Sequence, residues 1–234
     1  MDGFSYINLF DTKGIEYIII IAFLILIIPF WRMLNRPLRV NSGMKKAVLQ
    51  GSLLKAPQGI FLSNNHTWAH MLRSGDARIG INNLLINLTG DVNIKMVRDP
   101  GTRIRKGEVI TELERGGKRL AVVSPVSGEI TGSNPDLESD PSLLREDPYG
   151  GGWICSIRPT DWLGDISGFH FAAEANTWLK NEMERIRDFM AVAAHKYTPV
   201  TQAVYMQDGG EPAGFPLAAM PEEAWQEFQN EFLK

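Results

Sequence analysis

The chain has 234 residues, of which 22% are charged, and a formal net charge of −3 at pH 7. This length suits one domain of ordinary size with extensions, and the weakly acidic balance gives no sign of a nucleic-acid partner. The single cysteine, Cys155, excludes an intramolecular disulfide framework. Its apolar surroundings, Trp153 to Ile157, are typical of a small buried hydrophobic residue.

An apolar run near the N-terminus carries no charge between Tyr17 and Trp31. With its flanks it approaches the ~20 residues that a membrane-spanning helix needs, and aromatic residues stand at both of its ends. A signal peptide would show a basic n-region and a small-residue cleavage site, and a buried core helix would show a polar face. The sequence therefore predicts a transmembrane helix at residues 15–34, after a short extracytoplasmic lead at residues 1–14.

Basic residues then follow the apolar run, whereas Lys13 alone precedes it; they are Arg32, Arg36, Arg39, Lys45 and Lys46. Positive charge stays on the cytoplasmic side, so we expect a single-pass protein of the inner (cytoplasmic) membrane with its N-terminus outside and its main domain cytoplasmic. The lipid bilayer is then one partner, and residues 35–58 form a basic juxtamembrane linker.

Residues 59–160 show short alternating runs, such as Val109 to Leu113, separated by frequent Gly and Pro turns. This pattern is typical of a mainly β fold, a flattened β-barrel or sandwich. One extended run ends at Gly116-Gly117 and a second, Leu120 to Val123, follows, which predicts a tight hairpin because such turns need φ > 0 at their centre. Ser124 to Glu129 then turns the chain into another strand.

Residues 161–234 are predicted to be a C-terminal helical extension. Apolar residues recur at three- and four-residue steps over Phe169 to Tyr197, while charged residues such as Glu182 lie mostly elsewhere around the helix. A second, acidic helix runs from Pro221 to Leu233, with Trp225 on its apolar face. The apolar faces of these helices either pack on this chain or bind a partner, and the sequence does not decide between the two.

The motifs of residues 59–160 resemble, in the same order, those of the H protein of the glycine cleavage system, a relative of lipoyl and biotinyl carrier domains. The segments that carry the resemblance are His66-Thr67-Trp68, Arg78 to Ile81, Leu88 to Val92, Pro100 to Glu108, Ser124 to Glu129 and Asp147 to Ile154. The resemblance implies a barrel-sandwich hybrid of the lipoyl-domain type. It also implies a protein that is no enzyme by itself but carries a group among the active sites of its partners.

The resemblance places a lipoylated lysine at the hairpin tip, eight positions before the proline of the Ser-Pro-Val-Ser-Gly block. That position is Gly117 here, and Lys118 stands one place later. A one-residue shift along a strand turns a side chain to the opposite face unless a bulge compensates for it. We therefore expect no cofactor, with covalent lipoate on Lys118 as the alternative.

The sequence shows no catalytic set, no phosphate-binding loop and no cysteine cluster. His66 and His70 have the i, i+4 spacing of helical metal ligands, but no third ligand accompanies them, so no metal site is predicted. We therefore expect a non-catalytic, membrane-anchored H-protein-like subunit. It would serve as an accessory or scaffold beside other protein subunits in a larger membrane complex, such as a respiratory or electron-transfer assembly. The alternative is a lipoyl-carrying protein with Lys118 as its attachment site.

Overall fold

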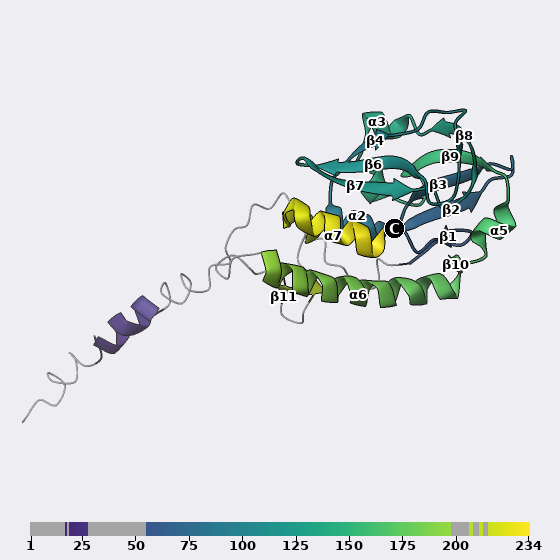
Figure 1. Cartoon of the computed structure of the whole chain (residues 1–234). Helices are drawn as coiled ribbons and strands as arrows, with labels where there is room; N and C mark the ends of the chain where they lie inside the picture. Colours follow the sequence, from purple (N-terminus) through teal and green to yellow (C-terminus); the bar gives the residue numbers. More distant parts are fainter. Residues whose placement is uncertain (1–16, 18, 28–54, 198–205, 208–210, 213–214) are drawn as a thin grey trace, which may run out of the picture. The chain divides into compact units, whose positions relative to one another are not determined.

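The structure of the chain is a computed structural model, and it describes residues 17, 19–27, 55–197, 206–207, 211–212 and 215–234. The chain contains two units, Met1–Lys45 and Lys46–Lys234. Residues 161–234 belong to the same unit as the strands that precede them (Figure 1).

In the first unit, Tyr17 and residues 19–27 are helical, and their side chains are exposed. Within the described part of the chain, no helix is long and apolar enough to cross a membrane. The predicted localisation, single-pass in the cytoplasmic membrane with the main domain cytoplasmic, is therefore wrong. The predicted lead and the rest of the predicted span lie outside the described residues, as does most of the linker.

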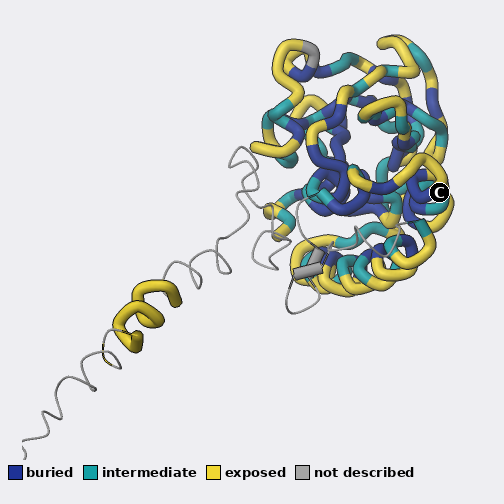
Figure 2. The backbone as a smooth tube through the Cα atoms, turned by 90° about the vertical axis from the view of Figure 1, so that its left-hand side faces the viewer, coloured by how far each residue is buried: buried dark blue, intermediate teal, exposed yellow. Residues whose placement is uncertain are grey.

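Two antiparallel sheets form the centre of the second unit. The larger sheet contains, in spatial order, β10 (His170–Phe171), β1 (Phe61–Leu62), β2 (Thr67–Met71), β3 (Ala77–Ile81), β9 (Trp153–Pro159), β8 (Gly128–Ser133) and β5 (Arg103–Ile104). The smaller sheet contains β4 (Asn93–Met96), β6 (Val109–Arg115) and β7 (Lys118–Val123). A further strand pair joins β11 (Met206–Gln207) and β12 (Glu211–Pro212). Figure 2 shows the buried residues gathered in the interior of this unit.

Helices lie between the strands and after them. They are α2 (Asn83–Thr89), α3 (Asp136–Ser139), α4 (Leu143–Glu146), α5 (Trp162–Ile166), α6 (Ala173–Tyr197), the 3₁₀ turn η1 (Leu217–Ala219) and α7 (Glu222–Phe232). The predicted mainly β fold with C-terminal helices is confirmed. The first long helix begins at Ala173 rather than at Phe169, because His170 and Phe171 pair with β1 and Ala172 has φ +52°.

The buried Trp68 explains two of the sequence motifs by packing. Trp68 stands opposite Gly80 in the β2–β3 pair, and its indole N–H donates to the carbonyls of Ile81 and Pro148, both at 3.0 Å. A Cβ on Gly80 would lie 2.4 Å from the Trp68 ring. Only a glycine at position 80 therefore leaves room for the ring over β3. The hydrogen bond from Trp68 to Pro148 connects the sheet to the loop before β9.

Both C-terminal helices pack on this chain. Ile186 and Met190 of α6 and Trp225 and Phe228 of α7 belong to the same buried cluster as the strands. Figure 1 shows α7 lying between α6 and the β6–β7 hairpin. The sequence left open whether the apolar faces of these helices pack on this chain or bind a partner. Both faces pack on this chain, and α7 lies directly against β7.

Candidate functional site at the β6–β7 hairpin

The hairpin tip is a two-residue glycine turn, as predicted. Arg115 pairs with Lys118 across it, and Gly116 and Gly117 have φ of 57° and 84°. Positive φ at both central positions is the requirement of a type I′ turn, which glycine meets without strain. A Cβ at either glycine would meet nothing within 4 Å. The position where the resemblance places the lipoyl lysine is therefore an open tip without a side chain.

Lys118 is the first residue of β7 and does not stand at the open tip. The hairpin register is regular from Arg115 back to Thr111, and the one irregularity falls between Val109 and Thr111, far from the turn. The bulge that would have moved Lys118 to the tip position is absent from this described hairpin. The Lys118 side chain follows the strand instead and turns toward the C-terminal segment.

The C-terminal segment holds the Lys118 ammonium group. Its Nζ donates to the carbonyl oxygens of Ala218 at 2.6 Å and Met220 at 2.7 Å, and lies 5.2 Å from the centre of the Trp225 ring. Burial, and then the positive charge of Arg115, hold the pKa of Lys118 below its ordinary value. Charged donors form the stronger hydrogen bonds, and an aromatic face adds attraction to the cation. We call this arrangement the Lys118 clasp.

Arg115, on the other side of the turn, fixes the hairpin to α2. Its Nη1 donates to the carbonyl of Thr89 at 2.7 Å, a favourable place for a cation because it is the C-terminal end of a helix. The guanidinium also lies 5.5 Å from the centre of the Phe215 ring. A Cβ on Gly90, where φ is 72°, would come within 2.0 Å of Nη1 and 2.7 Å of the Phe215 ring. Gly90 thus provides the space that both side chains use.

Gln229 of α7 completes the clasp along the edge of β7. Its side-chain oxygen accepts from the backbone N–H of Ala121 at 2.7 Å, and its amide nitrogen donates to the Ala121 carbonyl at 3.1 Å. Because β7 is the outer strand of its sheet, these backbone groups have no neighbouring strand. Trp225 is fully buried and donates to the carbonyl of Leu217 at 2.7 Å, which fixes η1 against α7.

The two histidines that might have bound a metal have structural roles. His66 precedes β2 and His70 lies within it, so their spacing is not helical. His66 is fully buried with φ +59°, its Nδ1 is 3.1 Å from the Asn82 amide, and its Nε2 is 3.4 Å from a carboxylate oxygen of Glu182. His70 Nδ1 lies 3.0 Å from the Gly59 carbonyl. Among the described residues, no three metal-ligating side chains lie close enough together to hold a metal ion.

Glu182 is a buried charged residue of α6. It is 3% exposed and pairs with Arg185 at 2.8 Å as well as facing His66. Burial raises the pKa of Glu182, but the hydrogen bonds and charges of His66 and Arg185 outweigh it, so the pKa lies below its ordinary value. Cys155 is buried as expected, and burial raises the pKa of its thiol to about 12.

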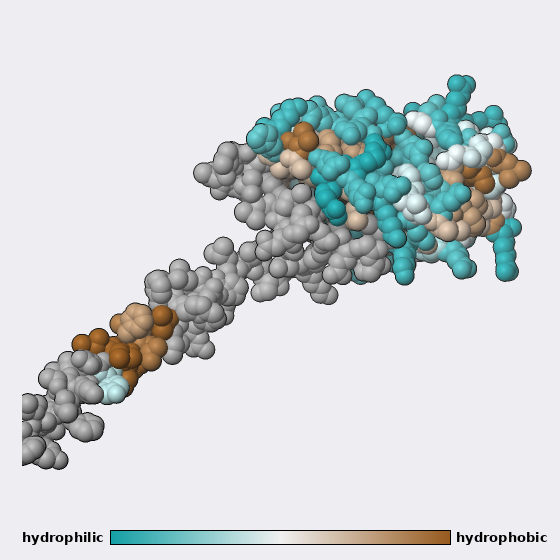
Figure 3. Space-filling model, turned by 90° about the horizontal axis from the view of Figure 1, so that it is seen from below, coloured by the Kyte–Doolittle hydropathy of each residue, from teal (hydrophilic) through white to brown (hydrophobic). Residues whose placement is uncertain are grey.

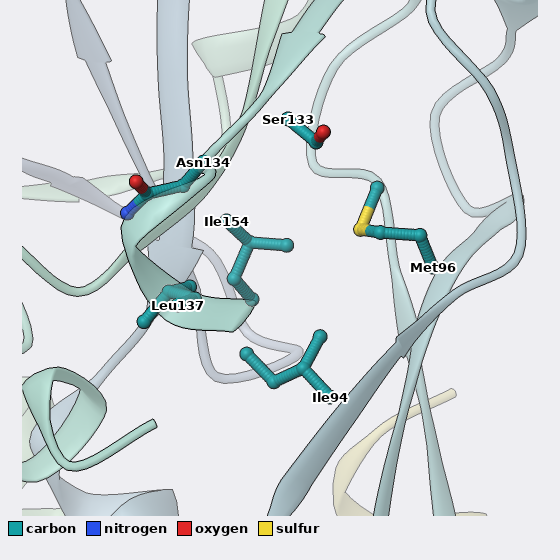
Figure 4. A pocket seen from close by; sticks show the side chains of 6 residues that line it. All are labelled: Ile94, Met96, Ser133, Asn134, Leu137 and Ile154. Carbon is teal, nitrogen blue, oxygen red and sulfur yellow. The ribbon is translucent and has the colours of Figure 1, made fainter. Parts of the chain in front are cut away.

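A small hollow elsewhere between the sheets has both apolar and polar residues in its lining. It has a volume of about 100 Å³ and is lined by Ile94, Met96, Ser133, Asn134, Leu137 and Ile154. In Figure 4, Ile94 and Met96 face Ile154 and Leu137 across the space. The Asn134 amide nitrogen is already used, by the carbonyls of Gly151 at 2.8 Å and Trp153 at 2.7 Å. A hollow of this volume is too small for a cofactor.

Sequence reasoning missed the residues that hold Lys118. Two of the partners are backbone carbonyls, those of Ala218 and Met220, and every residue type offers such a group. One feature of the sequence pointed toward this contact: the apolar face of the last helix, which includes Trp225, has to pack against some surface.

The fold and the glycine hairpin define a β module of the lipoyl-carrier type. A family model described as "Glycine cleavage H-protein" matches residues 60–182. A probable glycine cleavage system H protein of Pyrococcus abyssi is 34% identical over 127 residues, covering 54% of this chain and 94% of the relative. The H protein of Streptomyces coelicolor is 36% identical over 110 residues, covering 47% and 88%. The crystal structure of an H protein from Mycobacterium marinum has a TM-score of 0.45 and 25% identity, covering 54% of this chain and 99% of that one.

Because the family match covers more than half of the sequence, the chain belongs to the glycine cleavage H-protein family. The matched residues include the hairpin and the first part of α6. They end at residue 182, so η1 and α7 lie beyond them. The segment that clasps Lys118 is thus additional to the module that the family defines.

Proposed function

We propose that the chain is a non-lipoylated, non-catalytic H-protein-like accessory subunit that works beside other protein subunits in a larger complex. The observation that carries this proposal is the Lys118 clasp, in which the lysine next to the hairpin tip donates to two carbonyls of the same chain. The membrane setting expected from the apolar run is not part of the proposal.

The chemistry of lipoate attachment supports this reading. Attachment would convert the Lys118 amine to an amide, which is neutral and has a single N–H. One such group cannot serve both the Ala218 and the Met220 carbonyls, and the attraction of the cation to Trp225 would be lost as well. A carrier with its arm at Lys118 would therefore have to open its own C-terminal segment.

The position at the tip supports the same conclusion. Gly117 has no side chain, and the space around it is open. A modifying enzyme that binds the hairpin tip would therefore find no amine at this position. A carrier arm works by raising the effective concentration of its reactive end at each partner site. Without an anchor at the tip, the module is left with its surfaces as the means of acting on partners.

A lipoyl carrier with Lys118 as the attachment site is the second candidate. Family membership favours it, because the resemblance implies covalent lipoate in this family, and so does the position of Lys118 one residue from the tip. The clasp argues against it, since the amine would have to leave its two acceptors before it could react.

A lipoate ligase assay separates the two candidates. Purified full-length chain is incubated with ligase, lipoate and ATP, alongside Gly117→Lys and Lys118→Arg. We expect no modification of the wild type and of Lys118→Arg, and one lipoyl group on Gly117→Lys, whose new lysine would stand in open space. Peptide mapping that places lipoate on Lys118 of the wild type would overturn the proposal in favour of the carrier.

The accessory role has its own test. The tagged chain is purified from its source under native conditions and its assembly size is measured. We expect it to migrate with other polypeptides in constant proportion. Recovery as a lone monomer at the concentration found in cells would contradict an accessory role, whatever the state of Lys118.

A further inference from the structure

A groove opens to solvent where α6 and α7 lie side by side. Two adjoining hollows of about 390 and 350 Å³ share Phe189, Val192 and Glu231. The remaining lining residues are Arg185, Asp188 and Ala193 of α6 and Glu227 and Asn230 of α7. We call this feature the α6–α7 groove; from residue 185 to 193 it follows α6 for about 12 Å, or two helical turns.

The floor of the groove is apolar and firmly supported. Phe189 packs edge-on against Phe228 and Phe232, with ring centroids 5.7 and 5.5 Å apart. Beside it, Val192 of α6 is 68% exposed. Much of the surface seen in Figure 3 is hydrophilic. The opposite wall cannot move freely, because α7 is fixed by the buried Trp225 and by the bonds of Gln229 to β7. The groove is thus a preformed apolar surface two turns long.

The rim of the groove is acidic. Its carboxylates are Asp188, Glu227 and Glu231. Lys196 bonds to Glu227, and Arg185 is already engaged by Glu182 and by the Phe232 ring. Among the described residues, Asp188 and Glu231 have no ion pair. Two uncompensated negative charges therefore flank the exposed apolar floor.

We infer that the α6–α7 groove binds an amphipathic, basic helix of a partner protein. Two packed helices offer a groove that accepts the side-chain ridge of a third, and helix-in-groove recognition uses apolar anchors at i, i+3 or i+4 and i+7. The anchors, of Leu or Met size, lie against Phe189 and Val192, and flanking Lys or Arg side chains pair with Asp188 and Glu231. The inference rests on the proposed accessory role, for which it supplies the surface and the partner's chemistry. It does not depend on the state of Lys118.

The first test uses a labelled helical peptide of leucine and lysine, about 14 residues or four turns long. The peptide is titrated into the full-length chain, and binding is followed by fluorescence anisotropy. A matched peptide with glutamate in place of lysine reports on non-specific adhesion. We expect saturable binding of the lysine peptide and none of the glutamate peptide. Equal binding of both would overturn the inference.

Variants then locate the binding. Glu231→Lys turns an attractive charge into a repulsive one, and Val192→Lys replaces an apolar contact with a positive charge that repels the basic helix. Each is expected to weaken binding about tenfold. Glu184→Lys on α6 and Glu223→Lys on α7 make the same charge change as Glu231→Lys at exposed positions outside the groove, and should stay within about twofold. Equal weakening by all four would show general electrostatics and overturn the inference. Self-association of the wild type that Val192→Lys abolishes would also overturn it, because the occupant would be a second copy.

Native purification keeps this inference apart from the proposed function. If the chain has a partner that Val192→Lys loses and Glu184→Lys keeps, the groove is the docking surface. A partner that both variants retain would refute the groove but leave the accessory role intact. Absence of any partner for the wild type would refute the accessory role, and the inference with it.

Discussion

Removal of the Lys118 ammonium group is expected to loosen the C-terminal segment. Lys118→Met keeps an unbranched side chain but leaves the Ala218 and Met220 carbonyls without their donor. Hydrogen bonds to a charged group contribute about 1.5–3 kcal/mol each, and the cation over Trp225 adds about 0.5–1 kcal/mol. The site is only partly buried and Arg115 opposes the charge, so we expect a net loss of about 2 kcal/mol of unfolding free energy.

Two measurements check this value. The midpoint temperature of thermal unfolding, Tm, should fall by about 4–8 °C. Amide hydrogen exchange in α7 should become about 30-fold faster, a larger increase than that in β2 and β3. Lys180→Met, at an exposed position on α6, is the control and should change stability by less than about 0.5 kcal/mol. If Lys118→Met has the same exchange in α7 as Lys180→Met, the clasp does not hold the segment and the reasoning is refuted.

Three further changes probe the supports of the site. Gln229→Ala should destabilise the chain by about 1–3 kcal/mol in urea unfolding, because the N–H and the carbonyl of Ala121 each lose their Gln229 partner. The control Gln226→Ala, on an exposed face of α7, should have little effect. Gly90→Ala should lower stability by more than about 1 kcal/mol and raise hydrogen exchange at the hairpin, because Arg115 must give way; an unchanged Tm would contradict this. The pKa of Glu182 is lowered on folding, so its stabilising effect is full above the ordinary pKa of 4.5 and is lost as pH falls through the lower folded value. Unfolding free energy should therefore fall below about pH 4.5 in the wild type and less steeply in Glu182→Gln; parallel pH profiles would refute this role.

The hairpin and the general fold were predictable because local rules determine them. Two adjacent glycines between extended runs satisfy a turn that requires positive φ, and they do so at Gly116 and Gly117. The alternation of apolar residues along the strands likewise predicted a mainly β module. The start of α6 was placed too early, since the pairing of His170 with β1 overrides a helical pattern that continues through it.

The clasp itself could not be predicted. Strand periodicity tells on which face Lys118 stands, but the acceptors are carbonyls 100 and 102 positions away in the sequence. Glu182 posed a similar problem, because a glutamate on an amphipathic helix is usually solvated, and only the fold brings it to His66. The apolar run near the N-terminus satisfied the composition of a membrane span, yet no helix among the described residues is long and apolar enough to cross a membrane.

The most direct test of the account is the intact mass of the full-length protein isolated from its own cells under conditions in which lipoate is supplied. The account predicts the mass of the unmodified polypeptide, with Lys118 recovered as free lysine in peptide mapping. A mass increased by one lipoyl group, with that group on Lys118, would contradict the account and identify the chain as a carrier that releases its own clasp.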